Sequence, residues 1–221
     1  MKFLSAFDII GPNMVGPSSS HTAGAAKLGL LARKMFSGKI KVVSFTLYGS
    51  FAKTYRGHGT DRALLGGVLG FAPDDVRIRD AFSQARQQGI EYEFIIDEKE
   101  IPEHPNTADI RLQGIDGSTL SIRGESTGGG RVQITRINGV KVEFTGEYGT
   151  IIVRQIDKPG VVRHIVECVG NYNINIAFMK VFREEKGGYA YIVMEVDGEI
   201  PQELIEEARL NENIEEVLVI Q

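Results

Sequence analysis

The amino-acid sequence predicts an α+β protein in two parts: a mixed α/β domain over residues 1–146 and a ferredoxin-like domain over residues 148–221. The second part shows strand and helix patterns in the order βαββαβ, which is the split βαβ arrangement. The first part is longer and glycine-rich, and its helical patterns precede a series of short strands. A hydrophobic content of 42% and a charged content of 24% are ordinary for a globular chain and argue against disorder, collagen or a coiled coil.

The first part begins with a turn-rich stretch, 11–20, before an expected helix from Thr22 to Phe36 that is dominated by strong helix formers. Two further helical patterns cover 60–69 and 80–88, and Gly89 ends the second of them. Short apolar or alternating runs predict the strands, which are 41–47, 92–96, 108–112, 119–124, 131–137 and 141–144. Asn138-Gly139 predicts a hairpin turn between the last two strands.

The second part opens with a β-branched strand, 150–156, and an Asp-Lys-Pro-Gly turn at 157–160. Apolar residues at helical spacing predict a helix over 161–172. The remaining elements are expected to be strands 174–183 and 189–196 on either side of the turn 186–188, a helix over 201–210 and a strand over 215–220. The two parts meet near Glu147.

Composition excludes several classes of protein. The single Cys168 cannot form an internal disulfide, and it cannot supply the three or four thiolates that hold an iron–sulfur cluster. No run approaches the roughly 18–20 apolar residues that span a bilayer, and the N-terminus lacks a signal-peptide pattern, so we expect a cytoplasmic protein without a membrane partner. Cys168 itself lies on an apolar helical face, which predicts a buried structural thiol.

Charge is unevenly distributed, although 25 Lys and Arg against 29 Asp and Glu give a net charge of only −4. No acidic residue lies between Asp8 and Asp61, and this interval includes seven Lys and Arg residues. A positive field of this kind attracts an anionic ligand or an acidic partner, although a solvated basic helix face would give the same pattern. We expect no nucleic-acid partner, because there is no Trp and no interleaving of aromatic and basic residues.

Three of the four His residues, His21, His58 and His104, are predicted to lie in loops beside Gly, Pro or hydroxyl residues. A His between two glycines, such as His58, combines close backbone approach with a pKa suited to proton transfer near neutrality. A surface His in a turn is the alternative for His58 and for His104. Their spacing matches no short metal-ligand pattern, so no metal site is expected in this chain. His164 is interpreted as structural.

Two hydroxyl- or glycine-rich stretches are candidate ligand loops. Ser18 to Thr22 precedes a helix, where it could form an ordinary cap or an anion-binding loop at the helix N-terminus. Ser126 to Gly130 lies between two strands and fits either a flexible turn or a ligand loop. Asp157 to Gly160 lies where a strand meets a helix, and it could present backbone N–H groups to a carboxylate.

Residues 148–221 resemble an ACT domain, a regulatory module that binds amino acids. The resemblance rests on the loop Asp157 to Gly160, the helix after it, and the segment Asn171 to Ile176. It implies that L-serine or another amino acid binds between paired ACT domains, and hence that the protein is an oligomer. By the same resemblance, Gly160, Asn173 and Asn175 are the candidate regulatory contacts.

Residues 1–146 resemble the beta chains of bacterial iron–sulfur-dependent L-serine dehydratases. The matching stretches are Ile10–Pro12, Gly16–Gly24, Tyr48–Ser50, Gly57–Asp61 and His104–Asn106. The resemblance implies conversion of L-serine to pyruvate and ammonia, with a [4Fe–4S] cluster ligated by a separate alpha chain whose open iron acts on the serine hydroxyl. It also implies a substrate-binding type of α/β domain, like the regulatory domain of some phosphoglycerate dehydrogenases.

From this resemblance we expect His58 and His104 to reach the shared active site as catalytic acid–base or orienting groups. The expected substrate-binding residues are Ser18, Ser19, Ser20, His21, Thr22, Gly59 and Thr60. Two alternatives stay open. The chain could be a freestanding amino-acid-binding regulatory module with no catalytic residue, or a scaffold that only covers the cluster.

Overall fold

The computed structural model describes residues 13–221, so Ile10–Pro12, part of the resemblance noted above, lies outside the described residues. The chain divides into two compact units, Met1–Gly139 and Val140–Gln221, and each is described by itself. The α+β prediction is confirmed, because both units combine helices with a sheet. The domain boundary predicted at 146–148 stays a prediction. Within residues 13–221, no helix is both long enough and apolar enough to cross a membrane.

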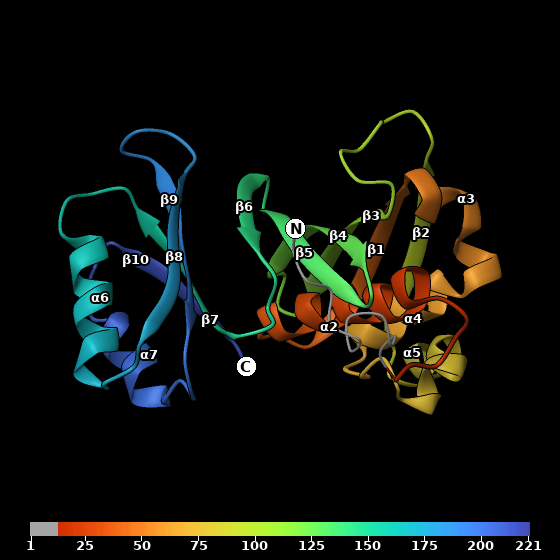
Figure 1. Ribbon diagram of the computed structural model, residues 1–221, viewed down its shortest axis with the longest axis horizontal. Helices are drawn as coiled ribbons and strands as arrows, with labels where there is room; N and C mark the ends of the chain where they lie inside the picture. Colours follow the sequence, from red (N-terminus) through yellow and green to blue (C-terminus); the bar gives the residue numbers. More distant parts are fainter. Residues whose placement is uncertain (1–12) are drawn as a thin grey trace, which may run out of the picture. The chain divides into compact units, whose positions relative to one another are not determined.

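The sheet that begins in the first unit has the strand order β2-β1-β3-β4-β5-β6 (Figure 1). Strand β1 pairs parallel to β2 and antiparallel to β3, and β3, β4 and β5 continue as an antiparallel meander. The strands are β1 Ile40–Tyr48, β2 Glu91–Asp97, β3 Thr107–Gly114, β4 Thr119–Gly128, β5 Arg131–Ile137 and β6 Val140–Phe144. Each strand predicted in this region is therefore present, with ends that differ by a few residues.

Helices cover one face of this sheet, against which the alternate side chains Val43, Phe45 and Leu47 of β1 are fully buried. The helical segments are η1 Ser19–Gly24, α2 Ala25–Met35, α3 Gly49–His58, α4 Thr60–Val68, η2 Val76–Asp80 and α5 Ala81–Gln87. Helices α2 and α4 approach closely at two glycines. A Cβ on Gly67 would lie 2.1 Å from the carbonyl oxygen of Ala26, and one on Gly29 would lie 2.1 Å from that of Leu64.

Two helical features differ from the sequence prediction. The first helix begins at Ser19 instead of Thr22. Its first turn, η1, is a π-helix, which is rare in proteins and is often found at functional sites where it does occur. Helix α3 was not predicted, because its sequence GSFAKTYRGH contains two glycines and few strong helix formers. It forms nonetheless because Phe51 and Ala52 are buried under the sheet. His21 and His58 therefore lie in helical turns, and placing them in loops was wrong.

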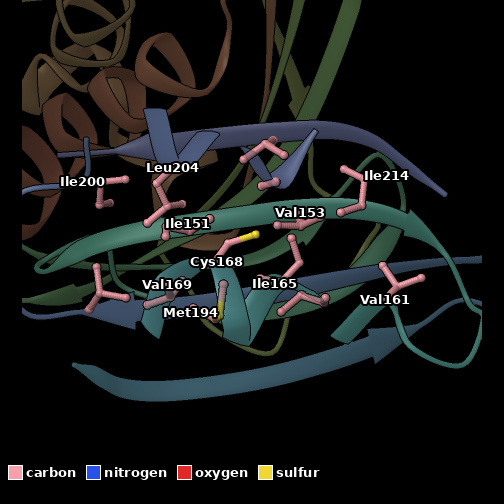
Figure 2. Close-up of a cluster of buried hydrophobic side chains, with 14 residues drawn as sticks. Ile151, Val153, Val161, Ile165, Cys168, Val169, Met194, Ile200, Leu204 and Ile214 are labelled. Atoms are coloured by element: carbon pink, nitrogen blue, oxygen red, sulfur yellow. The ribbon is translucent and has the colours of Figure 1, made fainter. Parts of the chain in front are cut away.

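The second unit has the predicted βαββαβ order, with a sheet arranged β10-β7-β9-β8. Its elements are β7 Gly149–Ile156, α6 Val161–Asn171, β8 Ile176–Arg183, β9 Tyr189–Val196, α7 Gln202–Ala208 and β10 Ile214–Ile220. Figure 2 shows the core of this unit, where Ile151 and Val153 of the sheet face Ile165 and Cys168 of α6. The alternation of strand residues and the apolar stripe of α6 thus produce one shared core.

The burial of Cys168 predicts a pH-dependent stability. The thiol is 1% exposed. Burial, together with nearby Glu207, raises the pKa of Cys168 to about 11. A thiol with a raised folded-state pKa stabilises the fold below the unfolded-state pKa and loses that contribution as the pH rises through the folded-state value. We expect this group alone to lower the free energy of unfolding by about 2–3 kcal/mol between about pH 9 and pH 11.

The measurement is urea unfolding of the natural chain and of Cys168→Ala at several pH values. The free energy of unfolding of the alanine variant should decline less over this pH range, so the difference between the two proteins gives the contribution of the thiol. If the free energies of both proteins changed in parallel with pH, the thiol would have the same pKa in the folded and unfolded chains.

Candidate active site

The site of the first unit is a cavity of about 520 Å³ beside the junction of α3 and α4. Residues from the segment before η1, from the α3–α4 junction and from η2 form its walls. They are Val15, Gly16, Pro17, Thr22, Arg56, Gly57, His58, Gly59, Asp61, Arg62, Ile78 and Arg79. Thr22 is the one residue of Ser18–Thr22 that lines the cavity, and Gly57–Asp61 contributes all its residues except Thr60.

Gly59 forms the junction itself. It adopts a left-handed conformation, with φ of 68°, and it is both the C-cap of α3 and the N-cap of α4. A side chain there would meet no atom within 4 Å, so the backbone conformation and not space favours glycine. The two helices consequently meet at a sharp turn that places His58 at the cavity wall.

Two buried polar atoms flank this glycine without a hydrogen-bond partner among residues 13–221. They are Nδ1 of His58 and Oγ1 of Thr60, and Thr60 is completely buried. An unsatisfied buried polar group costs free energy and is unusual in native proteins. Of these two residues, His58 lines the cavity and Thr60 does not.

His21 faces His58 across the site. The centroids of these two rings are 4.8 Å apart, and the centroids of the His21 and Phe51 rings are 5.2 Å apart in a T-shaped arrangement. Both nitrogens of His21 have partners: Nδ1 lies 3.0 Å from Oγ of Ser20, and Nε2 lies 2.9 Å from Oγ of Ser50. Burial and the neighbouring imidazole of His58 hold the pKa of His21 below its ordinary value.

Polar groups of Ser18, Ser20 and Thr22 have separate structural partners. Oγ of Ser18 accepts a hydrogen bond from the backbone N–H of His21 at 3.1 Å, so the predicted helix cap is present. Oγ1 of Thr22 donates to the carbonyl oxygen of His58 at 3.0 Å. The carbonyl of Ser20 accepts from the buried Ser126 at 2.9 Å. These hydrogen bonds hold the segment against α3 and β4.

His104 lies in the loop between β2 and β3, as predicted, and is not among the residues that line the cavity. Its Nδ1 accepts a hydrogen bond from the backbone N–H of Asn106 at 3.1 Å. A neutral imidazole that accepts at Nδ1 has its proton on Nε2, so the free nitrogen of His104 is a hydrogen-bond donor. Two backbone hydrogen bonds hold this loop beside α3 and β4. The N–H of Ser50 donates to the carbonyl oxygen of Pro105, and the N–H of Ser126 donates to that of Asn106.

Ser50, Phe51 and Ser126 are site residues that the sequence analysis did not select. Ser50 belongs to the Tyr48–Ser50 stretch and Ser126 to the glycine-rich Ser126–Gly130 stretch, so both were noticed without a role. Ser126 is fully buried in β4 and bonds to Ser20 and to the His104 loop, which favours a structural role for it. Their contacts join residues 20 to 106 positions apart in the sequence, which no local pattern reveals.

A polar network anchors the other end of the His104 loop. Arg123 on β4 donates to both carboxylate oxygens of Asp109, at 2.6 and 2.9 Å, and also to Glu100 in the loop. The hydroxyl of the buried Tyr48 donates to Asp109 at 2.8 Å and accepts from Arg123 at 3.0 Å. Each charge has an opposite partner, so the network joins the loop to β1, β3 and β4.

The cavity wall is predominantly basic. Three arginines line it, Arg56, Arg62 and Arg79, against one acidic residue, Asp61. Burial raises the pKa of Asp61 above its ordinary value, and the hydrogen bond from the N–H of Arg62 opposes this. Of the seven Lys and Arg residues between Asp8 and Asp61, Arg56 lines this cavity, whereas Arg62 and Arg79 lie beyond that interval. A basic wall of this kind favours an anion such as a carboxylate.

The described residues do not suit a metal or an iron–sulfur cluster. Within residues 13–221, no group of three or more His, Cys, Asp or Glu side chains could hold a metal ion. Cys168 is buried in the core of the second unit and has no second cysteine beside it. The donor atoms of this part of the chain therefore do not fit the cluster that the resemblance implies.

The candidate regulatory residues lie at opposite ends of α6. Gly160, with φ of 91°, is the N-cap of α6, whereas Asn173 and Asn175 follow its C-terminus. The amide of Asn175 donates to Asp197 at 2.8 Å, and Asn173 adopts a left-handed φ of 55°. A helix of 11 residues is about 16 Å long, so these residues do not form one compact site within a single chain.

The chain thus has an α/β domain with two neighbouring histidines, followed by a ferredoxin-like βαββαβ domain. Comparison with known families agrees: the serine dehydratase beta chain model matches residues 5–98, and the AHAS small subunit-like ACT domain model matches residues 151–218. The chain is 41% identical to the probable L-serine dehydratase, beta chain, of Bacillus subtilis, over 100% of this chain and 99% of that protein. The protein belongs to the serine dehydratase beta chain family.

Two further relatives match the chain to different extents. The L-serine dehydratase, beta chain, of Peptoniphilus asaccharolyticus is 40% identical over 92% of each chain. The D-3-phosphoglycerate dehydrogenase of Methanocaldococcus jannaschii is 37% identical over 39% of this chain and 17% of its own length. The expected resemblance to phosphoglycerate dehydrogenases is therefore confirmed as a partial one.

Proposed function

We propose that this chain is the beta subunit of a two-chain L-serine dehydratase and forms the active site together with an alpha chain. The reaction is the conversion of L-serine to pyruvate and ammonia. The observation that supports this most strongly is the unpartnered Nδ1 of His58 at the wall of an arginine-lined cavity. Both beta-chain relatives match nearly the whole chain, which supports the same conclusion.

In this proposal His58 transfers the proton at the Cα carbon of serine, because its Nδ1 has no competing partner among the described residues. His104 donates through Nε2–H as an acid or orienting group once the alpha chain completes the site. The substrate carboxylate binds beside Ser18, Ser19, Ser20, Thr22, Gly59 and Thr60, near the arginines of the cavity. These assignments limit the chain to substrate binding and proton transfer.

The [4Fe–4S] cluster belongs to the alpha chain in this proposal, because the described donor atoms of the beta chain do not fit it. When bound, the cluster would supply a Lewis acid to the serine hydroxyl. We also assign the enzyme to the cytoplasm and to serine catabolism, in keeping with a chain whose one cysteine is a free, buried thiol.

A second function is favoured by the ACT match of residues 151–218. We propose that L-serine or another amino acid regulates the enzyme by binding near Gly160, Asn173 and Asn175. Since these residues lie at opposite ends of α6, two copies of the chain would complete each site. The alternative is that the chain acts without an alpha chain, as a freestanding amino-acid sensor. The following experiment tests this alternative.

The test is anaerobic capture of the tagged chain from its native host, followed by assay of the captured material for pyruvate formed from L-serine. We expect turnover together with iron and a cysteine-rich partner chain. Capture of the chain with no partner, iron or turnover would contradict the enzyme-subunit proposal and favour the amino-acid sensor.

A further inference from the structure

The structure shows a close pair of imidazoles, His21 and His58, in which the two members have different environments. Nδ1 of His58 has no partner among residues 13–221, whereas both nitrogens of His21 are bonded to serine hydroxyls. A histidine with both ring nitrogens occupied has no free donor or acceptor for a ligand. The two rings therefore cannot have the same role.

His21 also joins both ends of helix α3. Its Nε2 bonds to Ser50 in the first turn, and its ring contacts His58 at the last residue. These two positions are eight residues apart, which corresponds to about 12 Å along a helix. The adjacent Thr22 binds the carbonyl oxygen of His58, so η1 holds His58 at both its ring and its backbone.

The groups around the pair favour an uncharged His21. The other groups in contact with its ring are the hydroxyls of Ser20 and Ser50 and the Phe51 ring, none of which is charged. The charged groups that line the cavity with His58 are Arg56, Arg62 and Arg79 and the carboxyl of Asp61. Two protonated imidazoles at this distance would repel each other, and burial opposes a charge on His21 further. These effects agree with its lowered pKa.

We propose that His21 is a positioning residue, which fixes the imidazole of His58 through Ser20, Ser50 and the ring contact and does not itself bind the substrate. The inference rests on the proposed function, because it assumes that His58 transfers a proton. It revises the expectation that His21 contacts the substrate, L-serine. A group that only positions another should affect the rate of the chemical step and leave substrate binding nearly unchanged.

The kinetic test uses the beta chain assembled with its alpha chain. His21→Phe keeps a ring between Phe51 and His58 but loses both serine bonds. We expect kcat to fall by about 10- to 100-fold, with KM for L-serine changed less than about twofold. His21→Gln can keep an amide near Ser50 and should restore part of kcat, and Ser50→Ala should resemble a weaker His21→Phe. A raised KM with unchanged kcat would overturn the proposal, because it is the result expected of a substrate contact.

A second test needs no alpha chain. NMR titration of the imidazoles in the full 221-residue chain should show His21 titrating below the ordinary His range. His58→Gln should raise the pKa of His21, while His164→Gln, in the other unit, should leave it unchanged. A His21 titration that His58→Gln does not move would show that the two rings are not in contact and would overturn the proposal. If the unmodified beta chain and its alpha chain together did not turn over L-serine, the proposed function would be refuted. The titration would still decide whether the rings of His21 and His58 are in contact.

Discussion

The substitution His58→Gln is expected to reduce serine turnover by the assembled enzyme by at least about 100-fold, in line with the usual contribution of a general acid–base group. Glutamine keeps a polar side chain of similar length but cannot exchange a proton near neutrality. The folded chain should keep its stability, because Nδ1 of His58 has no hydrogen bond to lose and only its backbone carbonyl is bound by Thr22. The measurement is the steady-state rate of pyruvate formation beside a thermal unfolding curve.

Lys53→Gln is the matched control for this prediction. Lys53 is exposed on the same helix, α3, and does not line the cavity. The control should retain turnover within about twofold, as expected for a surface substitution away from the site. Undiminished turnover by His58→Gln would remove His58 from the proton-transfer step and leave His104 as the remaining assigned group of the beta chain.

The substitution Gly67→Val is expected to destabilise the first unit by more than about 3 kcal/mol, at or beyond the upper end of ordinary overpacking. A Cβ on Gly67 would lie 2.1 Å from the carbonyl oxygen of Ala26 and 2.6 Å from the nitrogen of Leu30. Both contacts are with the backbone of α2, so no side-chain rotation can relieve them. Helices α2 and α4 would have to separate, which would expose part of the core under the sheet.

Gly57→Ala provides the control within the same unit. Gly57 lies in α3, and a Cβ there would meet nothing within 4 Å. Alanine exceeds glycine in helix propensity by up to about 1 kcal/mol, so this variant should be as stable as the natural chain or slightly more stable. The comparison uses the urea midpoint of the two variants. A Gly67→Val chain with the natural midpoint would show that α2 and α4 are not in close contact.

The second unit could be predicted almost element by element, and the reason is physical. Most of its strands and helices have a periodic apolar pattern because they face one common core, as at Ile151 and Ile165. Strand β8 is the exception, because most of its side chains are exposed. The turn residues Lys186–Gly188 separate β8 from β9 as expected. Helix α3 could not be predicted in this way, because tertiary burial of Phe51 outweighs the poor helix propensity of its sequence.

The candidate site could be predicted in its residue types but not in its geometry. The sequence pointed to His21, His58 and the serines, whereas the pairing of the two imidazoles depends on residues 37 positions apart that meet through η1 and α3. Ser50 becomes a site residue because the first turn of α3 lies beside His21, and α3 itself was not predicted. His104 remains outside the cavity, and its predicted role depends on the alpha chain.

The most direct test of the central claim is to titrate a purified, cluster-loaded alpha chain with this beta chain under anaerobic conditions while measuring pyruvate formed from L-serine. We predict negligible turnover by either chain alone, and a rate that rises with added beta chain and saturates at a fixed ratio of the two. Addition of His58→Gln beta chain should compete for the alpha chain without supporting turnover. An alpha chain that dehydrates L-serine equally fast without the beta chain would contradict the account.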